Sequence, residues 1–93
     1  MTYTTEFPHY DDVISLPEGW IDTSWHNDVC PSFEKVCGDV TIRLWCDFKN
    51  PASREVGGTR FIVCQYDAND DEFFLIGQSE SMDEALALID RLN

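Results

Sequence analysis

The stretch Val40–Asp47 constrains the fold of this chain more than any other, because apolar and polar residues alternate along it. Val40, Ile42, Leu44 and Cys46 fall on one side of an extended strand, and the residues between them fall on the other side. A strand with one buried face requires this period of two. The stretch therefore predicts the central strand of a small antiparallel sheet.

Two later runs extend this predicted sheet. Thr59–Tyr66 is a second strand, joined to the central strand by the turn-rich connection Lys49–Gly58, which contains Asn-Pro and Gly-Gly. The acidic turn Asp67–Asp71 then leads into Glu72–Gln78. The consecutive apolar residues of this third strand predict burial on both of its faces.

The N-terminal half gives weaker patterns. We expect residues 1–8 to form a loose arm or an edge strand, and His9–Leu16 to form a short helix or turn. Trp20–Trp25 is a short strand, and Ser32–Cys37 is a further strand. A two-residue turn at Gly38–Asp39 joins that strand to the central one, with glycine available for a positive φ.

The C-terminal segment carries the clearest helical signal. Ser81 and Glu84 match a capping box, in which the serine caps the helix and the glutamate follows three residues later. An apolar stripe follows at helical spacing, consisting of Met82, Ala85, Leu86, Ile89 and Leu92. We expect an α+β fold: an antiparallel sheet of three to five strands with this helix packed on one face.

Length and charge set further bounds. The 93 residues make a single domain, 1–93, with a modest core. Eighteen acidic and six basic residues leave a net charge of −12. Residues 1–40 and 64–93 each carry −7, whereas residues 41–63 carry +2. This field repels nucleic acids and anionic membranes and attracts cationic partners, although it is equally consistent with simple solubility.

The sequence lacks the usual signatures of enzymes and membrane proteins. The N-terminus has no basic region followed by an apolar core, so we expect no signal peptide, and no apolar run approaches the length of a membrane span. We therefore expect a cytoplasmic chain with reduced cysteines. It contains neither a glycine-rich phosphate loop nor a serine nucleophile elbow. We expect a protein that is not an enzyme and that needs no cofactor or metal.

A zinc or thiol site is an alternative. His26 lies four residues before Cys30, and these two residues with Cys37 would supply three ligands from adjacent loops. The spacing matches no common zinc motif, and the chain has no C-x-x-C pair. The simpler interpretation treats His26 as a loop residue and the cysteines, including Cys46 and Cys64, as buried packing residues.

Trp45 has two interpretations. It lies on the side of the central strand opposite Ile42 and Leu44, beside Arg43. We favour packing beneath the N-terminal segment, because large exposed aromatic residues are uncommon. If that face is open, Trp45 is instead an anchor of a protein interface, where tryptophan and arginine are enriched.

Acidic residues supply the candidate contact surface. The densest cluster lies between two predicted strands, and a second group follows at the start of the predicted helix. We expect the two groups to lie close together in space and to form, with Trp45, a partner-binding surface: Asp67, Asp70, Asp71, Glu72, Glu80, Asp83 and Glu84. Carboxylates on alternate strand residues lie about 6–7 Å apart, a spacing that mimics a row of phosphates.

In size, charge and plan, the chain resembles the small acidic inhibitors encoded by phages and mobile elements, including anti-CRISPR proteins and DNA mimics. The resemblance covers the whole chain and rests on its two acidic segments, the run Asp67–Glu72 and the sheet-plus-helix pattern. It implies a monomer that blocks the basic DNA- or RNA-binding site of a protein complex, such as a CRISPR effector, in the host cytoplasm. The alternative is a structural protein that self-associates through sheet edges and Trp45.

Overall fold

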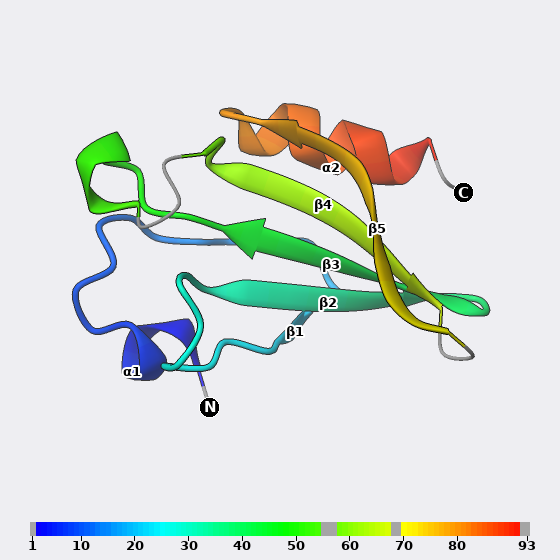
Figure 1. Ribbon diagram of the computed structural model, residues 1–93, viewed down its shortest axis with the longest axis horizontal. Coiled ribbons are helices and arrows are strands. Elements are labelled where there is room, and N and C mark those ends of the chain that lie inside the picture. The colour runs from blue at the N-terminus through cyan, green and yellow to red at the C-terminus, as the bar shows by residue number, and fades with distance from the viewer. Residues whose placement is uncertain (1, 55–57, 68–69, 92–93) are drawn as a thin grey trace.

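Five strands form one antiparallel sheet whose spatial order follows the chain order (Figure 1). The computed structural model describes residues 2–54, 58–67 and 70–91, and at residues 67 and 70–72 it describes the backbone alone. The strands are β1 (Ile21–Asp22), β2 (Ser32–Cys37), β3 (Val40–Cys46), β4 (Phe61–Asp67) and β5 (Asp70–Ser79). The predicted antiparallel sheet is confirmed.

The helical elements lie outside this sheet. They are α1 (Tyr3–Glu6), the 3₁₀ turn η1 (Pro51–Ser53) and α2 (Met82–Asp90). The predicted capping of α2 is confirmed, because the Ser81 hydroxyl accepts a hydrogen bond from the Glu84 backbone N–H at 3.4 Å. Leu92, the last member of the predicted stripe, lies outside the described residues.

The hydrophobic core lies between the sheet and α2, as the alternation in β3 requires. Ile42, Leu44 and Cys46 are fully buried. The other buried core residues come from β2, β4 and α2: Phe33, Phe61, Val63, Ala85 and Ile89. The helix approaches β5 closely at Gly77, where an added Cβ would lie 2.7 Å from Cδ1 of Leu88.

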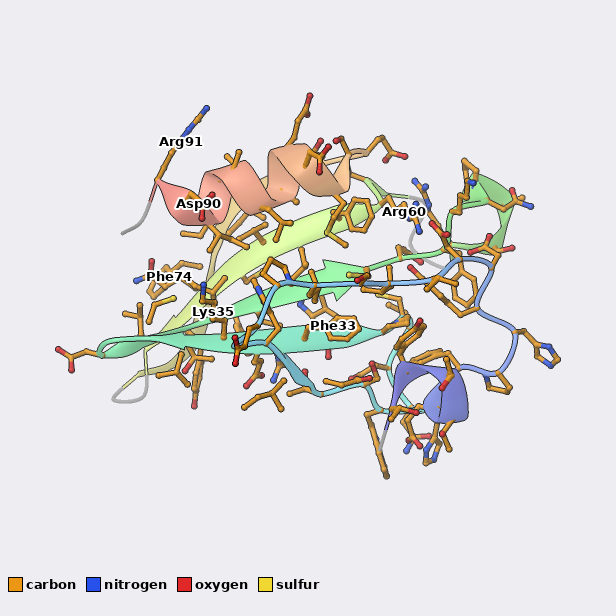
Figure 2. The ribbon with its side chains drawn as sticks, turned by 180° about the vertical axis from the view of Figure 1, so that it is seen from behind. Phe33, Lys35, Arg60, Phe74, Asp90 and Arg91 are labelled. Atoms are coloured by element: carbon orange, nitrogen blue, oxygen red, sulfur yellow. The ribbon has the colours of Figure 1, made fainter. Side chains whose placement is uncertain are left out.

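The N-terminal segment covers the same face of the sheet as α2. Tyr3, Ile14, Leu16 and Trp20 pack against the core, and the ring of Tyr3 lies 5.8 Å from that of Phe33. Figure 2 shows both coverings from their own side, with the blue segment crossing in front of the strands. The opposite face, which carries Trp45, is called the open face here because neither covering lies on it.

The N-terminal region differs from its prediction. Residues 3–6 form α1 instead of an arm or an edge strand, and residues 9–16 contain no helix, although a turn lies at residues 8–9 where the backbone N–H of Tyr10 donates to the carbonyl of Phe7 at 3.0 Å. Within this stretch, Asp11 accepts hydrogen bonds from the backbone N–H groups of Lys49 and Asn50, each at 2.8 Å. These two bonds fix the irregular segment of residues 9–16, called the irregular strap, to the chain that follows β3.

The strand predicted at Trp20–Trp25 is reduced to the two residues of β1. The carboxylate of Asp22 accepts from the backbone N–H of Ser24 at 3.0 Å and from that of Tyr3 at 2.6 Å. The chain stays beside β2 after Asp22, because the backbone N–H of Thr23 donates to the carbonyl of Ser32 at 2.9 Å and the Ser24 hydroxyl accepts from the Ser32 N–H at 3.2 Å, so a side chain takes over the ladder at this point.

The predicted burial of the last strand on both faces is also wrong. β5 is an edge strand, paired with β4 alone among the described strands. Phe73, Phe74 and Leu75 are 45%, 50% and 62% exposed. An apolar run identifies a strand, but it does not show whether a further strand lies beside it.

Candidate partner-binding surface

The fold gathers acidic positions from the β2–β3 turn and from the adjoining ends of β4 and β5 at one end of the sheet. Asp67 pairs directly with Val40 on one side and with Asp70 on the other, and Asp39 precedes Val40 in the β2–β3 turn. Neighbouring strands lie about 4.8 Å apart, so these backbone positions form a closely spaced row. We call this region the acidic end and define it by its residues: Asp39, Asp67, Asp70, Asp71 and Glu72.

The acidic end does not include the second predicted group. β5 extends from Asp70 to Ser79, which separates Glu80 from the acidic end by the length of that strand. Ten strand residues span about 30 Å. The expectation that the two groups lie close together is therefore wrong, because the strand that joins them is extended and not folded back.

Glu80 is a structural residue in this fold. Its carboxylate accepts two hydrogen bonds from the guanidinium of Arg54, at 3.0 and 3.1 Å, and a third from the backbone N–H of Arg60 at 2.7 Å. Arg54 also donates to the backbone carbonyls of Phe48, Lys49 and Gly58. The hydrogen bonds from Arg54 lower the pKa of Glu80 below its ordinary value of 4.5. Much of the Glu80 charge is thus compensated.

Asp83 and Glu84 remain exposed at the start of α2, where negative charge is favourable. Glu84 accepts a hydrogen bond from the Ser79 hydroxyl at 2.6 Å, so it also fixes the connection between β5 and the helix. Of the three predicted residues here, Asp83 is thus the one with no structural hydrogen bond described for its side chain.

Arg60, like Arg54, forms an ion pair with a carboxylate of the same chain. Arg60 donates to the carboxylate of Asp12 at 2.8 Å, to the Tyr10 hydroxyl and to the backbone carbonyl of Asp47. The hydrogen bond from Arg60 holds the pKa of Asp12 below its ordinary value of 3.8. Burial raises the pKa of Tyr10, so its hydroxyl stays protonated at neutral pH.

Trp45 lies on the open face and not beneath the N-terminal segment, so the arrangement that we favoured from the sequence is wrong. The guanidinium carbon of Arg43 lies 5.3 Å from the centre of the Trp45 ring and 4.8 Å from that of Phe73. Glu34 on β2 forms an ion pair with Arg43. Aromatic rings thus flank a neutralised arginine on this face.

A shallow apolar pocket of about 250 Å³ adjoins Trp45. Its walls include Ile62 and Cys64 from β4 and Val29 and Cys30 from the loop before β2. Cys64, which we expected in the core, therefore faces this pocket, because its place in the alternation of β4 points it to the open face. Cys46 is buried as predicted.

The zinc or thiol alternative does not match the structure. Cys30 and Cys37 flank opposite ends of β2, and the imidazole Nδ1 of His26 is hydrogen-bonded to Glu6 at 2.9 Å. Burial raises the pKa of Cys30 to about 12, which leaves its thiol protonated and a weak nucleophile. Across the described residues, no three His, Cys, Asp or Glu side chains are grouped so as to hold a metal ion.

The exposed apolar stretch Phe73–Leu75 is the feature that the sequence interpretation missed. A signal was available, because the last strand of a meander lies at the sheet edge unless another segment pairs with it.

Comparisons with protein-family models, curated proteins and solved structures found no match to this chain. In the described part of the chain, no helix is long and apolar enough to cross a membrane.

Proposed function

We propose that this chain is a non-catalytic binding protein that occupies the basic nucleic-acid-binding surface of another protein, such as a CRISPR effector. The acidic inhibitors that it resembles act in this way. The observation that carries the proposal is the acidic end, where the sheet brings together acidic positions from the β2–β3 turn and from the ends of β4 and β5. A partner that binds nucleic acid in the cytoplasm would place this chain there too.

The distribution of positive charge supports the proposal. Arg43, Arg54 and Arg60 are each held in an ion pair with a carboxylate of the same chain. Each of these cations therefore compensates one specific acid of the same chain. Each of these ion pairs is neutral, so the net charge of −12 is carried by the other charged residues.

The acidic end would act by electrostatic attraction. A concentrated negative field steers a basic partner into fast encounter, and the carboxylates then take the positions of phosphates in its groove. Such binding weakens with salt, because the Debye length falls from about 8 Å at 0.15 M to about 3 Å at 1 M. No bond is made or broken, so inhibition is reversible and is relieved by competing nucleic acid.

A tagged pull-down from nuclease-treated cell lysate, washed over a salt series, tests the proposal. We expect the chain to retain a nucleic-acid-binding protein that salt releases and added DNA or RNA displaces. Reversal of Asp70, Asp71 and Glu72 to lysine should abolish retention. Recovery of the same partner by that variant at the same salt concentration would contradict the assignment.

The matched control reverses three acids away from the acidic end, Glu18, Asp28 and Asp83, to lysine. Both triple variants change the net charge by the same amount, so overall charge cannot explain a difference between them. We expect the control to retain the partner. Equal loss in both variants would mean that net charge, and not the acidic end, drives binding.

Self-association is the second candidate function. The exposed edge strand β5 favours it, because an unpaired apolar edge is a template for another strand. Sedimentation of the purified chain distinguishes the candidates. A discrete oligomer that persists at high salt, with no partner recovered from lysate, would favour assembly.

A further inference from the structure

The outer edge of β5 is the longest unpaired backbone surface in the described sheet. β5 spans Asp70–Ser79, whereas the opposite edge strand, β1, has two residues. Along an edge, the N–H and C=O groups that point away from the sheet lack strand partners. Phe73, Phe74 and Leu75 add three consecutive exposed apolar side chains to this edge.

This edge lacks several of the usual protections against strand addition. Proteins commonly blunt edges with lysine, proline or very short strands. β5 contains no lysine and no proline, and its acids are confined to its first three residues. Two irregularities are present: a register shift opposite Val63 and Cys64 places Ile76 out of the ladder, and a second opposite Tyr66 and Asp67 places Asp71 and Glu72 out of it. They leave the stretch Phe73–Leu75 in regular pairing with β4.

The charge of β5 selects among possible occupants. A second copy of this chain would bring another net charge of −12 to the same edge, and two surfaces of like charge repel each other. An extended segment rich in lysine or arginine has the complementary charge. Its cationic residues would lie against Asp70–Glu72, while its apolar residues would cover the exposed stretch that follows.

We propose that β5 binds an extended basic segment of the partner, which adds to the sheet as a sixth strand. The inference rests on the proposed function and specifies how the partner is held. Main-chain hydrogen bonds along β5 supply affinity, and the pattern of acidic and then apolar residues supplies direction and specificity. The nearby open-face pair of Arg43 and Phe73 is positioned to contact side chains on one face of the added strand.

A synthetic peptide that alternates lysine and valine is the probe. Its control is a peptide of equal length and charge with proline at the central position, which removes a donor and disrupts a strand. We expect the alternating peptide to bind at least about tenfold more tightly than the proline peptide. Hydrogen exchange measured by NMR should slow at β5 amides, and amides of β1 should be unaffected.

Leu75→Arg is the informative variant, because it places a cation on the proposed binding edge. Ile21→Arg is its matched control, since Ile21 is 60% exposed on the opposite edge and Leu75 is 62% exposed. Both are exposed, so neither change should unfold the protein, which circular dichroism checks. We expect Leu75→Arg to weaken binding of the alternating peptide about tenfold relative to Ile21→Arg.

The remaining outcomes separate the two proposals. Equal salt-sensitive binding of both peptides, without protection of β5, overturns strand addition and leaves acidic binding intact. Failure of both peptides to bind, together with an empty pull-down, overturns both proposals. Protection of β5 that rises with protein concentration in the absence of peptide identifies a second copy as the occupant and overturns the basic-segment proposal.

Discussion

Among single residues, Arg54 has the largest described set of structural bonds. Its side chain is 4% exposed and donates to three backbone carbonyls and to Glu80. We expect Arg54→Ala to lower the free energy of unfolding by about 1–3 kcal/mol, because three backbone carbonyls and the Glu80 carboxylate lose their hydrogen-bond donor. Chemical denaturation measures this change.

Matched changes at two acids test which of them serve the fold. Glu80→Ala should also destabilise the protein, whereas Asp83→Ala, three residues away and exposed, should cost clearly less, because it removes only a favourable charge at the start of α2. An equal effect at both positions would show that the bonds between Arg54 and Glu80 contribute no stability.

Asp12 should make stability depend on pH in the acid range. The bond from Arg60 lowers the pKa of this carboxyl below 3.8 in the folded protein. Its stabilising contribution is therefore present above about pH 4 and is lost as the pH falls through the lowered folded pKa. We expect Asp12→Asn to reduce the loss of stability between about pH 4 and pH 2, as measured by thermal melts. The same loss of stability at acid pH in the variant and in the parent protein would contradict this role.

At the scale of elements, the packing of α2 is the strongest sequence-based prediction. Ile89 is 2% exposed within the core. We expect Ile89→Asp to cost about 3–5 kcal/mol, since it removes buried apolar surface and buries a charge. Ala87→Asp is the control, because Ala87 is exposed on the same helix. Comparable melting temperatures for the two variants would mean that α2 is not held by this face.

Local patterns predicted the elements whose signal lies within their own residues. The alternation of Val40–Asp47 and the capping box at Ser81 depend on neighbouring residues, and both match β3 and α2. The bonds that Asp11 accepts from Lys49 and that Asp22 accepts from Tyr3 join residues far apart along the chain, which a sequence pattern does not reveal. Trp45 is a similar case. The alternation places it correctly on the face opposite Ile42 and Leu44, but it does not show which of the two faces the N-terminal segment covers.

The candidate site was predictable only in part for a related reason. The density of Asp67–Glu72 is visible in the sequence, whereas its juxtaposition with Asp39 requires the register of β3 with β4. The separation of Glu80 from this cluster follows from the length of β5. The ion pair between Arg54 and Glu80 joins residues 26 positions apart, so a local sequence pattern does not show it.

For the whole molecule, the acidic end should oppose folding while it serves binding. Like charges gathered at one end of a chain of net charge −12 repel one another in the folded state. Added NaCl should therefore raise the melting temperature, because it screens this repulsion. Reversal of Asp70, Asp71 and Glu72 to lysine changes the net charge from −12 to −6. We expect this variant to be at least as stable as the parent at low salt, with a shallower salt dependence. Lower stability of the variant at low salt would show that these acids contribute to folding, and their density would then need no binding partner to explain it.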